Sequence, residues 1–341
     1  MLPMLAMLPM LAMLAMCTTT AGGSLLESDL PLPQPGAYDL RVQVLACGVC
    51  RTNLQVIDGD LPPRHPHLVP WHEVVGRVVA AGSAASRFRI GDRVCIPWLG
   101  GTCGHCAYCT GQRENLCDSP VFTGYDRNGG FAQYTVADEH FCFALPPACN
   151  DLHAAPLLCA GLIGFRAYRM SGVSGRMRLG LYGFGAAAYI LCQLAAAQGQ
   201  EVYAFVRADD ERSRQFAPQL GAYWAGPSDA PTPVELDAAL IFAPVGALVP
   251  AALRATRKGG VVVCAGIHMS DIPGFAYALL WGERQLRSVA NLTHADGEAF
   301  FSLIGRYPVT THVQPFPLAQ VNAAIAALRA GAIDGAAVLV P

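Results

Sequence analysis

A cluster of four cysteines restricts the fold of this chain more than any other feature. Cys103, Cys106, Cys109 and Cys117 stand at C-x2-C-x2-C-x7-C spacing. Four thiolates provide a complete tetrahedral set for Zn²⁺, and two-residue gaps let a tight turn aim neighbouring sulfurs at one ion. A closed four-sulfur site leaves no position for a substrate, so the pattern predicts a structural zinc. Binding of such an ion contributes about 10–16 kcal/mol in small peptides.

The same cysteines allow a disulfide pair, an iron–sulfur cluster or a thioredoxin-like redox motif. The ferredoxin pattern places its fourth cysteine after three residues and follows it with proline, whereas the redox motif uses only two sulfurs. The chain has 13 cysteines, an odd number grouped at metal-like spacings. This usage favours zinc in a reducing, cytoplasmic setting over a disulfide framework.

The overall composition sets the class of protein. A length of 341 residues suggests about two domains. With 53% hydrophobic and 14% charged residues, the chain can bury a large core. A net charge of −2 gives no reason to expect a nucleic-acid partner. Beyond the N-terminus no run of about 18 apolar residues occurs, so no membrane span is expected.

Residues 1–16 are a direct repeat with methionine at every third position. A period of three matches neither a helix nor a strand. The first basic residue is Arg41, so the positively charged start of a signal peptide is missing. Residue Met16 also stands where a lipoprotein site at Cys17 needs a small side chain. We therefore predict residues 1–24 to be a low-complexity extension without function, followed by a Pro-rich, turn-like segment over 25–36.

The first half of the remaining chain predicts a strand-rich domain ending near Pro156. Residues 41–46 alternate as a strand and run into Cys-Gly-Val-Cys at 47–50. Short strands and glycine turns continue up to the cysteine cluster and beyond it.

The second half predicts a doubly wound parallel sheet. An apolar run from residue 179 meets a G-x-G-x-x-A turn, followed by a helix to Gly199 and a strand over 201–206. Such a turn between strand and helix places a pyrophosphate at the helix N-terminus. The cofactor-binding residues expected here are Gly183, Phe184, Gly185, Ala186, Ala187 and Ala188.

Further alternation supports this sheet. Residues 236–243, 260–265 and 286–290 read as strands, and 245–256 reads as a helix. Near the C-terminus, 318–328 is an amphipathic helix, and 337–340 is a strand that we expect to rejoin the first domain.

Four landmarks occur in order: C-G-V-C-R-T at 47–52, H-E-V-V-G at 72–76, the four-cysteine cluster, and L-L-C-A-G at 157–161. With them the chain resembles the zinc-dependent medium-chain alcohol dehydrogenases from about residue 25 to its end. The likeness is closest to bacterial enzymes described as propanol-preferring, through 96–99, 122–125 and 265–273.

The resemblance implies an α/β protein of two domains with the active site in the cleft between them. A GroES-like catalytic domain would comprise 25–156 and 293–341, and a Rossmann NAD(P)-binding domain would comprise 157–292. It also implies a homodimer or homotetramer that acts on small alcohols or aldehydes.

The resemblance further implies a second, catalytic zinc held by Cys50, His72 and Cys159, with Glu73 beneath the ion. Thr52 would accept the alcohol proton. Arg51 would face the cofactor pyrophosphate, and Trp98 would form a pocket wall that favours small alcohols. Each chain would thus hold two zinc ions.

Four residues depart from the family pattern. Asn53 replaces the Asp that is usual beside the zinc histidine, and Gln55 replaces the His that is usual at the outer end of the proton relay. Both side chains are amides, which do not titrate. A large ring replaces the glycine before the zinc histidine, close to the metal, and its backbone is strained if φ is positive. An imidazole replaces an arginine near the cofactor. These residues are Asn53, Gln55, Trp71 and His294.

Cofactor choice depends on the end of the strand over 201–206. Enzymes that use NAD place an acid there for the ribose 2′-hydroxyl. Here Val206 occupies that position and Arg207 follows, which suits a 2′-phosphate. NADP(H) is therefore favoured over NAD(H), while Asp209 and Asp210 are expected to start the next helix. His268 is expected to form hydrogen bonds near the nicotinamide.

Two other functions stay open at this stage. One is a zinc-free quinone or enone reductase of the same superfamily, against which the complete cysteine and histidine set argues. The other is a non-catalytic descendant that binds zinc and nucleotide, which the departures at Asn53, Gln55 and Trp71 suggest.

Overall fold

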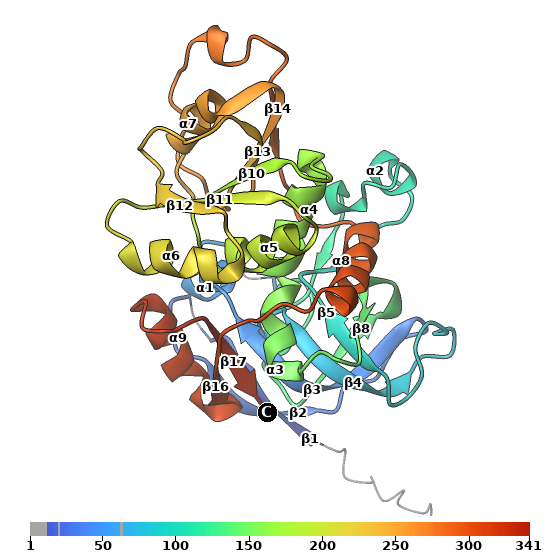
Figure 1. The fold of residues 1–341 in the computed structure, drawn as a ribbon. Coiled ribbons are helices and arrows are strands. Elements are labelled where there is room, and N and C mark those ends of the chain that lie inside the picture. Colours follow the sequence, from blue (N-terminus) through green and yellow to red (C-terminus); the bar gives the residue numbers. More distant parts are fainter. Residues whose placement is uncertain (1–11, 20, 62–63) are drawn as a thin grey trace, which may run out of the picture.

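Two large sheets, each with its own helices, organise the computed structural model (Figure 1). The structure describes residues 12–19, 21–61 and 64–341, and the side chains of residues 51–53 lie outside that description. The predicted α/β class with a strand-rich unit and a Rossmann-like unit is confirmed. The exact domain boundaries stay a prediction.

The first sheet has six parallel strands. Its order is β12 (Trp224–Pro227), β11 (Glu201–Val206), β10 (Arg178–Tyr182), β13 (Leu236–Ile241), β14 (Thr256–Cys264) and β15 (Gln285–Ser288). Numbered along the chain, this is the order 3-2-1-4-5-6 of dinucleotide-binding sheets. The sequence predicted four of these strands, β10, β11, β13 and β14, and a fifth near β15, but not the short edge strand β12.

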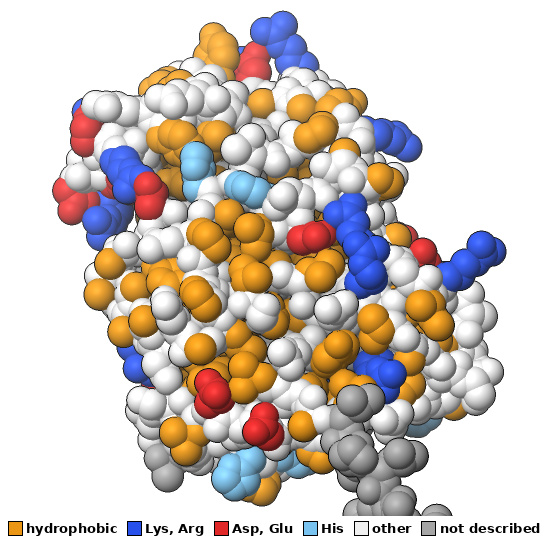
Figure 2. All heavy atoms as spheres, turned by 90° about the horizontal axis from the view of Figure 1, so that it is seen from below, with side chains coloured by type: hydrophobic (Ala, Val, Ile, Leu, Met, Phe, Trp, Pro, Cys, Tyr) orange, Lys and Arg blue, Asp and Glu red, His pale blue; other side chains and the backbone are white. Residues whose placement is uncertain are grey.

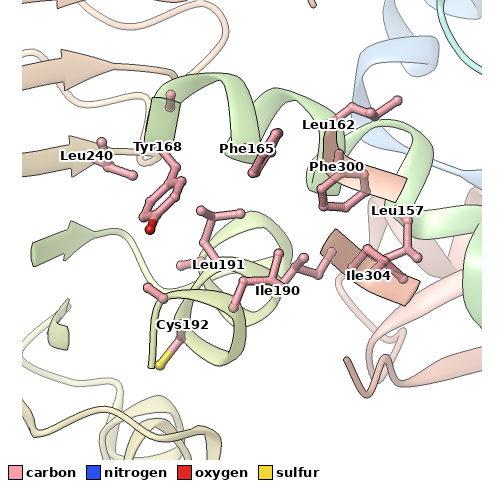
Figure 3. Packing of buried hydrophobic residues seen from close by; sticks show 14 of the residues in the cluster. Leu157, Leu162, Phe165, Tyr168, Ile190, Leu191, Cys192, Leu240, Phe300 and Ile304 are labelled. Carbon is pink, nitrogen blue, oxygen red and sulfur yellow. The ribbon is translucent and has the colours of Figure 1, made fainter. Parts of the chain in front are cut away.

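Alternating side chains bury both faces of this sheet. Leu179 and Leu181 of β10 face the core beneath α4 (Ala160–Ser171) and α5 (Ala186–Ala197), whereas Tyr182 faces the core beneath α7 (Leu248–Ala255). Figure 3 shows Phe165 and Tyr168 of α4 facing Ile190 and Leu191 of α5. Phe300 and Ile304 of α8 (His294–Arg306) close the same cluster. The helix α6 (Glu211–Phe216) follows β11.

The second sheet is mostly antiparallel. It runs β16 (Val313–Pro317), β17 (Ala336–Val340), β3 (Asp39–Val49), β4 (Val74–Ala81), β5 (Arg93–Ile96) and β9 (Phe143–Ala144), with β8 (Tyr134–Asp138) also paired to β3. The C-terminal strand β17 pairs antiparallel with β3, so the predicted return of the chain end to the first domain is confirmed. The helix α9 (Val321–Arg329) precedes β17, and α1 (Arg51–Asp58) follows β3. A small pair, β6 (Leu99–Gly101) and β7 (Val121–Phe122), flanks the cysteine cluster, which contains the short helix α2 (Ala107–Thr110). The short helix α3 (Asp151–Ala154) leads toward α4.

The expected lack of regular structure before residue 36 is wrong where the structure describes the chain, because strands form both in the methionine repeat and in the segment expected to be turn-like. That residues 1–24 have no function stays a prediction. Residues 12–17 form strand β1 (Ala12–Cys17), which pairs antiparallel with β2 (Leu26–Pro31). The Met16 amide donates to the Phe131 carbonyl at 2.8 Å, and Met13 and Met16 are buried in the core of the second sheet. The period-three pattern concealed a strand because Leu and Ala fill the positions between methionines, leaving no polar residues to mark the exposed face. Residues 1–11 lie outside the described part of the chain.

The burial of β1 leads to a stability prediction. Met16→Ala is expected to lower the free energy of unfolding by about 2 kcal/mol, because Met16 is buried. This value is at the lower end of the range for replacing a buried methionine with alanine, because Met16 belongs to a small two-stranded sheet. The neighbouring Leu26 is 57% exposed on β2, so Leu26→Ala should change it by less than about 0.5 kcal/mol. Urea unfolding of the zinc-loaded variants measures both values. Equal midpoints for Met16→Ala and the wild type would show that β1 does not contribute to the fold.

Charged side chains of both signs are interspersed on the surface. On the face drawn in Figure 2, Lys and Arg lie in small groups next to Asp and Glu, among hydrophobic and uncharged side chains.

Among the residues described here, none of the helices has the length and apolar character needed to cross a bilayer.

Candidate functional site

The four-cysteine cluster forms a compact lobe around α2 and the short 3-10 helix at Glu114–Leu116. The Sγ atoms of Cys106 and Cys109 are 3.5 Å apart, those of Cys103 and Cys117 are 3.5 Å apart, and those of Cys103 and Cys109 are 3.9 Å apart. These separations exceed a disulfide bond of about 2.05 Å. They match a tetrahedron with bonds of about 2.3 Å, whose edges measure about 3.8 Å.

Backbone groups of the lobe point at the sulfurs. The amides of Cys103 and Ser119 each donate to the Cys117 Sγ at 3.3 Å, and the Cys106 amide donates to the Cys103 Sγ at 3.4 Å. Backbone hydrogen bonds lower the pKa of Cys106 to about 6, whereas burial raises that of Cys109 to about 11. Backbone hydrogen bonds also lower the pKa of Cys103, so the lobe favours thiolate at two positions without a metal, and a dication would stabilise it at all four. The donor set fits zinc.

A second group of metal-ligand side chains comes together from three separate segments. Cys50 is the N-cap of α1, His72 and Glu73 precede β4, and Cys159 precedes α4. Their ligand atoms all lie within 4.8 Å of one another, and the Cys50 Sγ is 3.7 Å from the His72 Nε2. Residues 109 positions apart in the chain thus meet at one point.

Burial dominates the electrostatics of this group. It raises the pKa of the Cys50 thiol, and contact with Cys159 raises it further. Burial also raises the pKa of the Glu73 carboxyl well above its usual range. Two thiols and a carboxyl share a space into which the four residues bring no fixed positive charge, so a metal cation is the partner that would let them ionise. Two sulfurs and one imidazole nitrogen also match the ligand set of a catalytic zinc.

The backbone beside His72 is strained. Trp71 has φ 83° and Glu73 has φ 67°, in the left-handed region that only glycine adopts without cost. Trp71 is fully buried, and its ring stacks on Phe131 with centroids 4.3 Å apart. The backbone strain that the sequence predicts for a positive φ at Trp71 is therefore present. The Trp71 ring packs in the core of the second sheet.

The ring that contacts His72 belongs to Trp98. Its centroid is 4.9 Å from that of the imidazole, in an edge-on arrangement. Trp98 also stacks on Phe122 at 5.0 Å and on Tyr125 at 6.1 Å. Val56 joins these rings in a small apolar cluster. An aromatic wall therefore stands beside the second metal-ligand group.

The glycine turn has the shape predicted for dinucleotide binding. Gly183 follows β10 with φ 85°, and a Cβ there would lie 2.6 Å from the Ala243 nitrogen. Gly185 is the N-cap of α5, with open space where a Cβ would stand. The intervening Phe184 is buried, and residues 186–188 open the helix. A phosphate can thus approach the helix N-terminus closely.

The end of β11 carries the charged residues that bear on cofactor choice. Arg207 is exposed and lies 3.2 Å from the Asp209 carboxylate. Asp210 caps α6 by accepting from the Ser213 amide at 2.9 Å. The expectation that Asp210 starts the next helix is confirmed, while Asp209 is the counter-ion of Arg207.

Comparison with known proteins agrees with this geometry. A family model described as the alcohol dehydrogenase GroES-like domain matches residues 36–147. A probable alcohol dehydrogenase of Mycobacterium tuberculosis is 46% identical over 314 residues, covering 90% of each chain. The chain belongs to the medium-chain alcohol dehydrogenase family.

Solved structures of the fold extend the comparison. A cinnamyl alcohol dehydrogenase of Sorghum bicolor is 25% identical with a TM-score of 0.85, covering 96% of this chain and 97% of its own. A cobalt- and zinc-bound thermostable alcohol dehydrogenase of Pyrobaculum aerophilum has a TM-score of 0.86 at 22% identity, covering 97% and 100%. This second likeness shows the fold alone.

Three predicted site residues of this alcohol dehydrogenase begin α1, and their side chains lie outside the description: Arg51, Thr52 and Asn53. Their roles, including the bond from Asn53 to the zinc histidine, therefore stay predictions. The His72 Nδ1 is buried and has no hydrogen-bond partner among the described residues.

His294 lies against the cysteine lobe. It opens α8, and its amide donates to the Glu114 carboxylate at 2.6 Å. Its ring is 5.5 Å from that of Phe143. Burial, with the nearby Arg87, lowers the pKa of its imidazole. Its expected place near the cofactor stays a prediction.

The sequence did not pair His268 with Gln55, although both were singled out. The His268 Nε2 donates to the Gln55 Oε1 at 2.8 Å. The two residues are 213 positions apart, and no sequence signal joins them because Gln55 lies in α1 and His268 in the loop after β14.

Proposed function

We propose that this dehydrogenase is a zinc-dependent alcohol dehydrogenase and aldehyde reductase that transfers hydride reversibly between small primary alcohols and NADP(H). The observation that carries the proposal is the convergence of Cys50, His72 and Cys159, with Glu73, beside the aromatic wall. The 46% identical probable alcohol dehydrogenase of Mycobacterium tuberculosis supports the proposal by analogy.

The chain would divide the reaction among a few groups. Cys50, His72 and Cys159 would hold a zinc ion, and that ion would supply the Lewis acidity that makes an alcohol hydroxyl more acidic. The Thr52 hydroxyl would accept the alcohol proton, and the carbinol carbon would transfer hydride to the nicotinamide. The α5 N-terminus, with Arg51, would hold the pyrophosphate. The cysteine lobe would hold a second, structural zinc.

The aromatic wall supports a small, apolar substrate. Trp98, Phe122 and Tyr125 present ring faces and edges, which exclude water and offer few partners to extra hydroxyl groups. Transfer of a substrate's polar groups from water to such a wall is unfavourable when they find no hydrogen-bond partner there. Short alcohols and aldehydes therefore fit better than polyols.

We further propose that NADP(H) is preferred because Arg207 follows β11 where the ribose 2′ position is expected. Arg207→Ala should weaken NADPH binding by about tenfold. This is the lower end of the contribution expected for a hydrogen bond between charged groups, because the guanidinium is exposed to solvent. NADH binding should change little. Asp209→Asn removes the competing carboxylate and should tighten NADPH binding by about 2- to 5-fold. Fluorescence titration of each variant with both nucleotides measures this, and equal loss of NADH and NADPH affinity in Arg207→Ala would contradict the assignment.

The direct test of the function is oxidation of NADPH and NADH, side by side, by zinc-loaded protein with short aldehydes. Turnover with NADPH preferred supports the enzyme and the cofactor choice together. Turnover with NADH preferred keeps the enzyme and overturns the cofactor argument. No turnover with either, despite two bound zinc ions, overturns the proposed activity.

We also propose that the chain works as a homodimer or homotetramer in the cytoplasm. The assembly follows from the family likeness, and a reducing compartment suits a chain whose 13 cysteines are an odd number with metal-like spacings. Analytical ultracentrifugation of the zinc-loaded protein tests the assembly, and a monomer at micromolar concentration would contradict it.

A further inference from the structure

A hydrogen bond connects the loop after β14 of the first sheet to α1, the helix that begins at the metal ligand Cys50. The His268 Nε2 donates to the Gln55 Oε1 at 2.8 Å. His268 lies in the loop that follows β14, and Gln55 lies in α1. In sheets of this kind, ligands bind outside the carboxyl ends of the strands, so the His268 loop lies at the edge where the nucleotide is expected.

The helix at the other end of this bond begins at a metal ligand. Cys50 is the N-cap of α1, with φ −110° and no side-chain cap. Gln55 follows about one and a half helical turns later. A helix moves largely as a unit, so a force applied at Gln55 reaches Cys50.

The far end of α1 is held separately. Asp58, its last residue, forms an ion pair with Arg329 of α9, and the Gly22 amide donates to the Ile57 carbonyl at 2.6 Å. These contacts come from α9 and from the segment between β1 and β2, outside the first sheet. The His268 bond comes from the nucleotide-binding sheet, so it adds a second, independent point of attachment nearer to Cys50.

The loop that presents His268 is held in an uncommon backbone conformation. His268 has φ 53°, which costs a non-glycine residue about 1–2 kcal/mol. The preceding Gly266 packs closely, since a Cβ there would lie 2.8 Å from the Ala243 carbonyl oxygen. A strained residue persists where its surroundings hold it, and such residues cluster at functional sites.

We infer that His268 is a positioning residue that couples nucleotide binding to the geometry of the catalytic metal site through Gln55 and α1. Nucleotide bound beside the loop after β14 would shift His268, His268 would shift Gln55, and α1 would then move Cys50 relative to His72 and Cys159. The inference rests on the proposed function, because it requires a metal at that group.

Cobalt in place of zinc provides the spectroscopic test. The absorption of a cobalt–thiolate site depends on ligand geometry. In difference spectra with and without NADP⁺, the cysteine lobe cancels, and the wild type should show a band shift from the Cys50 group. His268→Ala and Gln55→Ala should each remove at least half of that shift, and the double variant should equal either single variant. NADP⁺ release, followed by stopped flow, should become about 2- to 12-fold faster, as expected for one lost hydrogen bond.

A control variant separates this bond from any other link between the units. Arg212 of α6 forms an exposed ion pair with Asp334, which precedes β17. Arg212→Ala should leave the cobalt shift unchanged. An equal loss of the shift in Arg212→Ala, or a full shift in His268→Ala, overturns the inference while the proposed function stands. Failure of the wild type to bind cobalt outside the cysteine lobe overturns the proposed function and the inference with it.

Discussion

Cys159→Ala is expected to abolish turnover, lowering kcat by more than about 10³-fold, and to reduce the zinc content from two ions to one. Loss of a single transition-state donor already costs about 10²–10³-fold in enzymes, and loss of the Lewis acid removes more. Cys50 and His72 alone leave an incomplete ligand set for a buried zinc. Steady-state kinetics and metal analysis of the purified variant measure both effects.

The matched control is Cys149→Ala. Cys149 is a half-buried thiol outside both metal-ligand groups, so this variant should keep two zinc ions and wild-type turnover. Near-normal turnover of Cys159→Ala with one zinc bound would contradict the catalytic-metal assignment and favour the zinc-free reductase. A Cys149→Ala protein that loses zinc would show that the loss reflects general damage.

Trp71→Gly is expected to destabilise the protein by about 2–5 kcal/mol, although glycine is the family's usual residue there. Glycine relieves the left-handed backbone at φ 83°, worth about 1–2 kcal/mol. Removing the fully buried ring that stacks on Phe131 costs about 3–5 kcal/mol. A glycine also adds about 0.5–1 kcal/mol through the entropy of the unfolded chain. The cavity therefore outweighs the relief of strain, and urea unfolding midpoints measure the result.

Trp71→Ala distinguishes the two contributions. Alanine leaves a similar cavity but keeps a Cβ at φ 83°, so it should be less stable than Trp71→Gly by about 1 kcal/mol. This order is the reverse of the usual one, in which glycine is the worse residue. An alanine variant more stable than the glycine variant would show that the backbone relaxes away from the left-handed region.

The close packing around Trp71 explains why its backbone is held. A Cβ on Gly129 would lie 1.9 Å from the Trp71 carbonyl oxygen, and one on Gly124 would lie 2.3 Å from the Trp71 nitrogen. The Gly130 amide donates to the same carbonyl at 2.8 Å. The chain therefore keeps the shape of a glycine position with a tryptophan in it, and the large ring fills the core.

Local patterns carried the predictions that the structure confirms. The four cysteines of the lobe lie within fifteen residues, so turn geometry alone brings their sulfurs together. The glycine turn after β10 is likewise local, because only glycine takes φ 85° without cost. The parallel strands β10, β11, β13 and β14 each contain a short, largely apolar stretch, which is the pattern of strands buried on both faces.

Errors arose where a pattern was ambiguous without its neighbours. The β1 segment reads as low complexity because Met, Leu and Ala are all apolar, and only its partners show which side chains face the core. The strand β12 is short, at Trp224–Pro227, and takes its register from β11. Strand identity in such segments is set by tertiary context rather than by propensity.

The sequence by itself determined the ligand types, the cysteine lobe, the dinucleotide turn and the family, because each depends on residues close in the chain or on motifs in a set order. The tertiary structure alone decided how Cys50, His72 and Cys159 meet, which tryptophan contacts the histidine, and that His268 reaches Gln55. Those contacts join segments more than twenty residues apart, and their geometry depends on how whole sheets and helices pack. Chain entropy opposes each of them until packing of the entire core stabilises it.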